Sequence, residues 1–470
     1  MALKIYNSIT KKKEEFKPLH EGFVGMYVCG PTVYGPTHVG HARSYVDFDV
    51  VFRYLSFLGY KVKYVQNITD VGHLVGDSDD GQDKILRQAK IEKIDPYEIA
   101  YKYENQYFDT MAKLNVLKPS ISVRATGCIL EMIDMVQTII DKGYGYVTSK
   151  GNVYFDVHKF KKYGALSNRT LTDTKSGERI AVAEDKKNPE DFALWKCAEP
   201  GHLMKWKSPW SVGFPGWHLE CSTMSKKFLG DTFDIHGGGI DNIFPHHESE
   251  IAQSEVANGK PFVRFFMHNN LVTVNGTKMG KSLGNFITLE DLFAKFDPIK
   301  VRFFILQFHY RSPIDFNFNA IENAGAIYDR INDAVISLRE KCKDIAEITD
   351  PEIKEIYNNF VNAMNEDFNT PVAISELIRA VKVININVQA KNTDKLKQLN
   401  KLIADLAENV LGLKFESNKN QSSNKEQELL DIIENTRQIL REEKNYALSD
   451  KIRDELQKSG FVAQEIKIGI

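Results

Sequence analysis

Residues 25–55 read GMYVCGPTVYGPTHVGHARSYVDFDVVFRYL, in which an apolar, strand-like run ends on Cys29 and a helical pattern begins near His38 and His41. The next apolar run, YKVKYVQNITD at 60–70, returns to the pattern of a strand. Strand, helix and strand in this order are typical of a βαβ unit, so we predict an α/β fold with a doubly wound, Rossmann-type parallel sheet. Ligands of such sheets bind beyond the carboxyl ends of the strands, where the following helix offers unpaired N–H groups to an anion. The sequence therefore predicts a binding site around Cys29.

Two histidines flank a valine and a glycine at the start of the predicted helix. His38 and His41 are able to donate hydrogen bonds to phosphate oxygens, and Gly40 lets a nucleotide base or ribose approach the backbone closely. The tetrapeptide is also compatible with an ordinary helix start, so this motif alone leaves both interpretations open.

The composition indicates several packed domains. The chain has 470 residues, 42 % of them hydrophobic, and a net charge of −2. Its apolar runs all fall short of the roughly 18 to 20 residues that span a bilayer, so we expect a cytoplasmic protein that makes no use of a membrane. A near-neutral chain can still bind RNA through a local basic surface.

The sequence changes character several times along the chain, and these changes set the expected domains. We predict a catalytic domain followed by an α-helical bundle, because apolar runs alternate with helical patterns early in the chain and helical patterns dominate after about residue 318. Short β-like pieces and charged turns in between indicate an insertion, and ESNKNQSSNKEQ is a polar, low-complexity stretch. The expected boundaries are 1–118 and 206–270 for the two catalytic halves, 119–205 for the insertion, 271–318 for a loop region, 319–415 for the bundle, 416–427 for a linker and 428–470 for a terminal segment.

Two cysteines, a histidine and a glutamate are candidates for a metal site. His246 and Glu250 are four residues apart after Pro245, which suits the first turn of a helix, so their side chains share one face. Thiolates such as those of Cys29 and Cys221, together with imidazole, favour zinc, and a carboxylate completes a tetrahedron. Buried cysteines that act as small apolar residues are the alternative. The HExxH pattern of metalloproteases is absent from the sequence.

A lysine pair and a glycine triplet suggest a nucleotide site. Lys278 and Lys281, in KMGKS, are able to stabilise the charge that develops as pyrophosphate leaves. In HGGGID, Gly238 and Gly239 would lie beneath a planar base and Asp241 would accept from a ribose hydroxyl. A solvated surface loop remains the alternative for the lysines.

Taken together, these motifs resemble those of the class I aminoacyl-tRNA synthetases, and specifically the cysteinyl-tRNA synthetase family. HVGH resembles the family's HIGH motif, KMGKS resembles its KMSKS motif, and PGWHLECS, FDIHGGGIDNIFPHHESEIAQSE, KSLGNF and MNEDFNTPVAI match further blocks. The similarity runs from about residue 20 to the end. Gly280 replaces the usual serine, Phe214 stands where an arginine is frequent, and VGHLVGDSDDGQDK is longer than the shortest family versions.

The resemblance implies a reaction and a role for each motif. L-cysteine would react with ATP, with Mg²⁺, to give cysteinyl adenylate and pyrophosphate, and cysteine would pass to the 3′ end of its cognate tRNA. One Zn²⁺ would be held by Cys29, Cys221, His246 and Glu250 and would bind the substrate as a thiolate. The resemblance places Thr69 and Trp217 around the amino acid, His38, Gly40, His41, Gly238, Gly239 and Asp241 at ATP, and Lys278 and Lys281 at the transition state.

The resemblance also assigns the C-terminal third to tRNA binding. The last segment would read the anticodon, with Arg441 and Asp450 as candidate contacts, because RNA loops are read by hydrogen bonds and by arginine stacking. A solvated, charged helix face is the alternative for either residue. The family implies a monomer.

Three other functions remain to be compared. A cysteine ligase that joins cysteine to an amino sugar shares the adenylating core but lacks a long helical C-terminal region. A nucleotidylyltransferase would share the HVGH-type motif without the four metal ligands. A non-catalytic RNA-binding or zinc-structured protein would not need the lysine pair.

Overall fold

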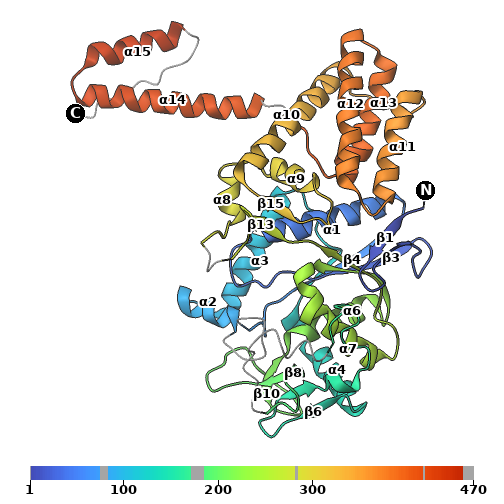
Figure 1. The fold of residues 1–470 in the computed structure, drawn as a ribbon. Helices are drawn as coiled ribbons and strands as arrows, with labels where there is room; N and C mark the ends of the chain where they lie inside the picture. Colours follow the sequence, from blue (N-terminus) through green and yellow to red (C-terminus); the bar gives the residue numbers. More distant parts are fainter. Residues whose placement is uncertain (1, 75–82, 171–184, 281–283, 417–418, 459–470) are drawn as a thin grey trace. The chain divides into compact units, whose positions relative to one another are not determined.

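The chain forms two units, residues 1–414 and 415–470, which are described separately below. Figure 1 shows the computed structural model, which describes residues 2–74, 83–170, 185–280, 284–416 and 419–458. Within these ranges, no helix has the length and apolar character needed to cross a membrane.

A five-stranded parallel sheet forms the centre of the first unit. Its strand order is β12-β11-β3-β4-β5, and every neighbouring pair is parallel. The strands are β3 (Phe23–Val28), β4 (Lys61–Ile68), β5 (Ile121–Arg124), β11 (Phe233–Gly239) and β12 (Val263–Asn269). This arrangement confirms the predicted doubly wound parallel sheet, with the first strand, β3, at its centre.

Helices connect the strands of this sheet. They are α1 (Val39–Phe57), α2 (Lys84–Glu92), α3 (Pro96–Lys113), α4 (Ile129–Asp141), α6 (Trp217–Leu229) and α7 (Glu248–Asn258). From β3 the chain crosses toward β5 through α1 and α3, whereas α7 leads from β11 in the opposite direction to β12. Because such crossovers are right-handed, α1 and α3 cover one face of the sheet and α7 covers the other.

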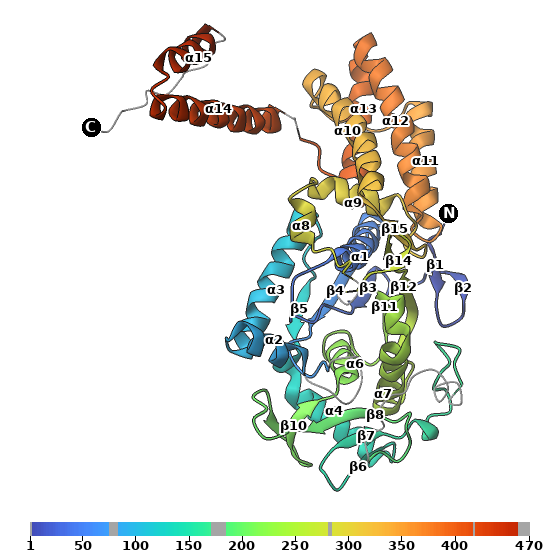
Figure 2. The same cartoon turned by 60° about the vertical axis from the view of Figure 1, so that its left-hand side comes forward.

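The insertion forms a second, antiparallel sheet, which lies at the opposite end of the first unit from the helical bundle (Figure 2). Its strands, in the order β6-β7-β8-β10-β9, are β6 (Gly145–Val147), β7 (Val153–Phe155), β8 (Phe192–Cys197), β10 (Val212–Pro215) and β9 (Trp206–Lys207). Both expected insertion boundaries are crossed by strand pairing. The strand after residue 119, β5, belongs to the parallel sheet, and the two strands after residue 205 pair with β8 or with each other. The strands β5, β9 and β10 are short and have few apolar positions, so the sequence did not indicate which sheet each of them joins.

Smaller elements border the parallel sheet. The N-terminal hairpin is β1 (Lys4–Asn7) and β2 (Lys12–Glu15), and a three-stranded sheet is formed by β14 (Thr277–Lys278), β13 (Val272–Val274) and β15 (Ile314–Phe316). Two helices, α8 (Leu289–Phe293) and α9 (Pro298–Leu306), lie between β14 and β15 in the chain. Short helical turns lie at Ala125–Cys128, Val157–Lys159, Ile240–Asn242 and Ile243–His247.

The helical bundle closes the first unit. It consists of α10 (Phe318–Lys341), α11 (Pro351–Asn365), α12 (Thr370–Ala390), α13 (Thr393–Leu402) and the π-helical segment Ile403–Val410. A buried arginine connects the end of this bundle with the catalytic domain. Arg302 of α9 pairs with Asp49 of α1 and donates to the carbonyl oxygen of Leu411, and all of the Arg302 side chain is buried. The α1 helix is therefore held by both the sheet and the end of the bundle.

The second unit is a helical hairpin of α14 (Lys419–Glu442) and α15 (Tyr446–Lys458). The first of these helices begins inside residues 416–427, the range expected to be a linker. Lysine, glutamine and glutamate are good helix formers, so a polar stretch of this composition is able to extend a solvent-facing helix. The linker expectation is corrected accordingly.

Candidate active site

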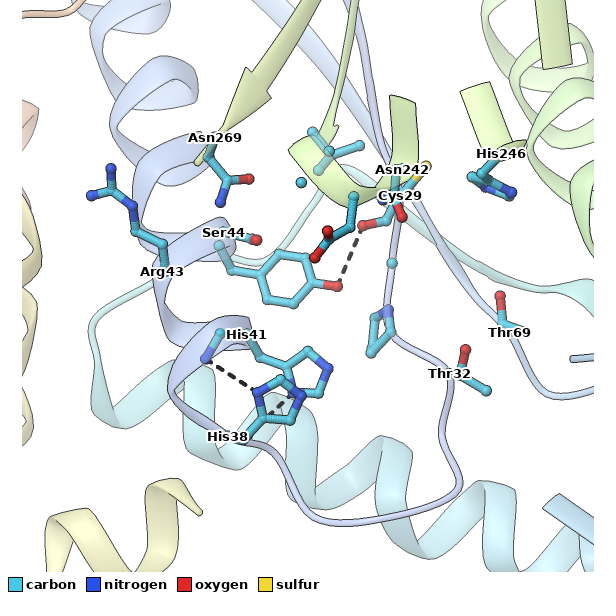
Figure 3. Close-up of a pocket in the computed structure, with 18 of the residues that line it drawn as sticks. Cys29, Thr32, His38, His41, Arg43, Ser44, Thr69, Asn242, His246 and Asn269 are labelled. Carbon is cyan, nitrogen blue, oxygen red and sulfur yellow. Dashed lines mark hydrogen bonds between the residues drawn. The ribbon is translucent and has the colours of Figure 1, made fainter. Parts of the chain in front are cut away.

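A cavity of about 370 Å³ opens at the carboxyl ends of the central strands. Its lining brings together residues from distant parts of the first unit (Figure 3). Among them are the predicted site residues Cys29, His38, Gly40, His41, Thr69, Trp217, Gly238, Gly239, Asp241 and His246. The parallel sheet thus places these candidates at the edge where ligands bind in such folds.

The two histidines of the HVGH motif cap helix α1. His38 is the N-cap residue, and its Nδ1 accepts from the Gly40 backbone N–H at 3.1 Å, while Nδ1 of His41 accepts from the His38 N–H at 3.2 Å. Because Nδ1 accepts in each ring, a neutral imidazole at either position carries its hydrogen on Nε2. A Cβ at position 40 would lie 2.9 Å from the His38 ring, so a larger residue here would displace that ring from its capping position. The cap therefore fixes the orientation of both rings, and both residues line the cavity.

The four predicted metal ligands lie together. The ligand atoms of Cys29, Cys221, His246 and Glu250 are all within 4.8 Å of one another. Cys29 follows β3, Cys221 is in α6, and Glu250 is in the first turn of α7. His246 precedes α7, in the π-helical turn, so Pro245 does not begin that helix as the sequence suggested. The residue before it, Phe244, has extended backbone angles, as proline favours in its predecessor.

The spacing of these atoms fits a tetrahedral ion. Zinc–sulfur bonds of about 2.3 Å and zinc–nitrogen bonds of about 2.0 to 2.1 Å place two sulfurs roughly 3.8 Å apart and a sulfur and a nitrogen roughly 3.6 Å apart. The Sγ atoms of Cys29 and Cys221 are 3.8 Å apart, and Cys221 Sγ lies 3.5 Å from His246 Nε2. The donor set, two sulfurs with an imidazole and a carboxylate, matches the preferences of zinc.

Burial keeps the acidic members of this cluster from ionising on their own. It raises the pKa of Glu250 well above the ordinary value, and burial followed by the hydrogen bond with Cys29 raises the pKa of Cys221 in the same direction. A divalent cation reverses this preference, because it stabilises thiolate and carboxylate directly. The cluster therefore favours a bound cation over a thiolate and a carboxylate that are buried without one.

Histidines that the sequence interpretation did not select surround the cluster. Nε2 of His236 lies 2.7 Å from Glu250 Oε2, and Nε2 of His247 lies 3.2 Å from Cys29 Sγ. These two histidines form a second set of four possible ligands with Cys29 and Glu250. Burial, then the neighbouring histidines, lowers the pKa of His247 well below the ordinary value. The sequence offered a signal for His247, because it directly follows the selected ligand His246 in FPHHESE and both occur in one turn.

Thr69 and Trp217 lie on the wall of the cavity near the metal candidates. Trp217 is stacked between His73, at a ring distance of 4.0 Å, and His246, at 4.2 Å. The hydroxyl of Thr69 donates to Oε2 of Glu220 at 2.6 Å. Neither His73 nor Glu220 was selected from the sequence, because neither belongs to a recognisable spacing pattern.

The glycine triplet has two structural roles. A Cβ on Gly238 would lie 2.8 Å from the His247 ring, so this glycine lets the histidine approach the strand. At Gly239 nothing lies within 4 Å of an added Cβ among the described residues, and this glycine faces the cavity together with Asp241.

The lysine pair is only partly described. Lys278 pairs through its backbone with Thr273 in the three-stranded sheet, and Lys281 lies outside the described residues, as does Ser282. Met279 borders the cavity, and its Cε would lie 3.7 Å from a Cβ at position 40. The side chain of Met279, the residue after this strand, therefore reaches the HVGH motif.

The two anticodon candidates lie in the second unit and pair with each other. Nη2 of Arg441 is 2.8 Å from Oδ1 of Asp450, and Nε of the same arginine donates to the Ser449 hydroxyl. The pair joins α14 to α15.

Two family models match the chain. The one described as the class I (C) tRNA synthetase catalytic domain matches residues 15–326, and the one for the DALR domain matches residues 359–416. Two curated relatives are similar over their full length. The cysteine–tRNA ligase of Chlorobaculum tepidum is 49 % identical, with 100 % of this chain and 98 % of the relative covered, and that of Bacteroides fragilis is 48 % identical, with 99 % and 98 % covered.

Solved structures with the same fold are other class I synthetases. The methionyl-tRNA synthetase of Mycobacterium tuberculosis in complex with methionyl-adenylate has a TM-score of 0.62 at 14 % identity, and the alignment covers 83 % of this chain and 92 % of that one. The leucyl enzyme of Agrobacterium radiobacter, in a ternary complex with tRNA, has a TM-score of 0.58 at 12 % identity, with 84 % and 85 % covered. Likeness at such low identity shows the fold alone.

Proposed function

The chain belongs to the class I cysteine–tRNA ligase family, and from this membership we propose which residues activate L-cysteine with ATP and which take part in its transfer to tRNA. Membership confirms the family resemblance of the motifs and the reaction of an aminoacyl-tRNA synthetase. The observation that carries the proposed site is the cluster of Cys29, Cys221, His246 and Glu250 beside the cavity.

In our proposal these four residues hold one zinc ion. When bound, zinc supplies a soft Lewis acid that holds the substrate sulfur as a thiolate. A pocket that selects by size alone distinguishes substrates that differ by one small group by only about 10- to 200-fold. Serine differs from cysteine in one atom, so a metal that prefers sulfur provides selection that the pocket walls alone do not.

The remaining cavity residues position the two reactants. Thr69 and Trp217 enclose the amino acid, and the hydrogen-bond donors of His38 and His41 bind phosphate oxygens of ATP. Gly40, Gly238, Gly239 and Asp241 receive the nucleoside, with Mg²⁺ accompanying the phosphates. The geometry that supports this division is the single cavity that all of these residues line.

Activation requires the cysteine carboxylate to attack the α-phosphate while pyrophosphate leaves. We assign stabilisation of the charge that develops to Lys278 and Lys281, since a positioned cation acts most strongly where charge appears in the transition state. The adenylate then acylates the terminal adenosine of tRNA, and the protein supplies no nucleophile.

The helical part would bind tRNA. The DALR match in the bundle supports this assignment, and we propose that the C-terminal unit reads the anticodon, with Arg441 and Asp450 as candidate contacts. Their mutual ion pair must open, or one of them must act through its remaining polar atoms, for either to contact a base. We further propose a monomer that acts in the cytoplasm, as the family membership suggests.

The test is ATP–pyrophosphate exchange that depends on cysteine, followed by charging of tRNA for cysteine by the same preparation. We expect rapid exchange with cysteine and much slower exchange with serine. Exchange without charging, together with transfer of cysteine to an amino sugar, would replace the tRNA function with that of the related ligase.

A further inference from the structure

A buried glutamate beside the cysteine pocket has no role in the function proposed above. Glu220 lies in α6 between Trp217 and Cys221, and its side chain is 0 % exposed. Its Oε2 accepts from the Thr69 hydroxyl at 2.6 Å, and its Oε1 has no hydrogen bond with the residues that the structure describes. Burying a polar group with an unsatisfied oxygen costs free energy. This cost, at a residue next to the proposed substrate pocket, suggests that Glu220 has a function.

The hydroxyl of Thr69 is held from two sides. It donates its one hydrogen to Glu220, and it accepts from Nδ2 of Asn67 at 3.0 Å. The Asn67 amide is oriented in turn, because its Oδ1 accepts from the Gly30 backbone N–H at 2.7 Å. A hydroxyl has one donor and two acceptor lone pairs. One lone pair of Thr69 therefore remains, and Thr69 lines the cavity.

We propose that Glu220 is a positioning residue for the substrate amino group. By taking the hydrogen of the Thr69 hydroxyl, it leaves the oxygen as an acceptor only, matched to the three N–H donors of the α-ammonium group of cysteine. Without Glu220 the hydroxyl is free to rotate and to point its hydrogen at that cation. This inference rests on the proposed contact between Thr69 and the amino acid.

Replacement of Glu220 by methionine tests the inference. Glu220→Met keeps a side chain of similar length but removes the acceptor, so the KM for cysteine in pyrophosphate exchange should rise about 10- to 100-fold, the range expected for loss of a hydrogen bond to a charged group. The fall in kcat should be smaller than the rise in KM. Glu220→Gln retains an acceptor oxygen and should recover most of the affinity.

An analogue without the amino group separates positioning from general damage. In our proposal, 3-mercaptopropionate retains the thiol and the carboxylate but does not use Thr69. Its inhibition constant should therefore change less than threefold in Glu220→Met, while the KM for cysteine rises. Equal losses for cysteine and for the analogue would overturn the inference, as would an unchanged KM for cysteine.

Glu248 provides a matched control. It is also a fully buried glutamate near a metal candidate, its Oε2 accepts from the Ser167 backbone N–H, and its Oε1 has no partner in the described part of the chain. Glu248→Met should change the constants for cysteine and for the analogue by the same factor. If both Glu220 variants lose their zinc or their fold, Glu220 supports the metal site instead, and the inference is overturned. Absence of cysteine-dependent exchange in the unaltered protein would instead overturn the proposed function itself.

Discussion

The sulfur atoms of Cys29 and Cys221 lie 3.8 Å apart, although 192 positions separate the two residues in the chain. Purified protein should accordingly contain one zinc ion per chain. Cys221→Ala should lose most of this zinc by metal analysis and should lose discrimination against serine in pyrophosphate exchange, because one soft ligand is missing. Cys197→Ala is the control, since that thiol lies outside both ligand sets. Full zinc content in Cys221→Ala would contradict the site.

Lys281 should contribute to the transition state more than to ATP binding. In Lys281→Ala the rate of adenylate formation should fall about 100-fold or more, as for other removed electrostatic contacts, while the KM for ATP changes far less. Single-turnover formation of adenylate measures the first quantity. Lys260→Ala serves as the control, because this lysine pairs with Asp231 at an exposed position. Equal losses in rate and in ATP affinity would reduce Lys281 to a binding contact.

The C-terminal unit should be dispensable for activation. A chain ending at residue 416 lacks α14 and α15 but retains the cavity and all four metal candidates. Cysteine-dependent pyrophosphate exchange should remain within about twofold. The KM for tRNA should rise at least tenfold, since each good base contact contributes about 1 to 3 kcal/mol by analogy with DNA readout. Unchanged charging by the shortened chain would remove the anticodon role of this unit.

The buried pair of Arg302 and Asp49 should be important for stability. Arg302→Met leaves the carboxylate of Asp49 without one of its two arginine partners and should lower the free energy of unfolding of the first unit by about 3 to 5 kcal/mol. Thermal unfolding followed by circular dichroism checks the effect. Arg339→Met removes an ion pair whose side chains are each about one-third exposed and should cost at most about 1 kcal/mol. Similar losses in both variants would mean that burial of the first pair is unimportant.

Asp47 should make the first unit less stable as the pH rises. Burial raises the pKa of this carboxyl to about 7, while Arg43 and Arg302 lower it by less. Between about pH 4 and 7 the unfolded chain releases this proton and the folded chain retains it, so the unfolded state is increasingly favoured. Asp47→Asn removes the effect. Its stability relative to the unaltered protein should rise across this range, by at most about 4 kcal/mol.

Melting temperatures of the two proteins at several pH values measure the Asp47 effect. Asp109→Asn, at an exposed position of α3, controls for the change in net charge. A difference between Asp47→Asn and the unaltered protein that stays constant from pH 4 to 8 would show that Asp47 is ionised in the fold.

The central sheet could be predicted from the sequence because its strands are apolar runs separated by helical patterns. The spacing of His246 and Glu250 correctly suggested that the two side chains are close, and their atoms lie 3.0 Å apart. Spacing could not join this pair to Cys29 and Cys221, since contacts between distant segments depend on the strand order. The family resemblance supplied that link.

Several features could not be predicted from the sequence, for physical reasons. Polar composition does not distinguish a coil from a solvent-facing helix, so the start of α14 was assigned to a linker. The histidine ring of residue 247 reaches Cys29 only because Gly238 leaves room for it. Nothing in the sequence distinguishes Glu220 from other helical glutamates. Its hydrogen bond with Thr69 joins two segments that are distant in the chain, so only the structure shows it.

The position of β3 at the centre of the sheet has a consequence for synthesis of the chain on the ribosome. One edge of β3 pairs with β4 soon after both are made, but its other neighbour, β11, begins about 170 residues after β4 ends. At about 5 to 20 residues per second this interval lasts roughly 10 to 30 s. During it, one edge of the apolar strand β3 remains unpaired, which is the kind of edge that promotes aggregation. Slower translation across the insertion would lengthen that exposure, so the yield of folded protein should depend on the codons used there and on chaperones that shield the nascent chain.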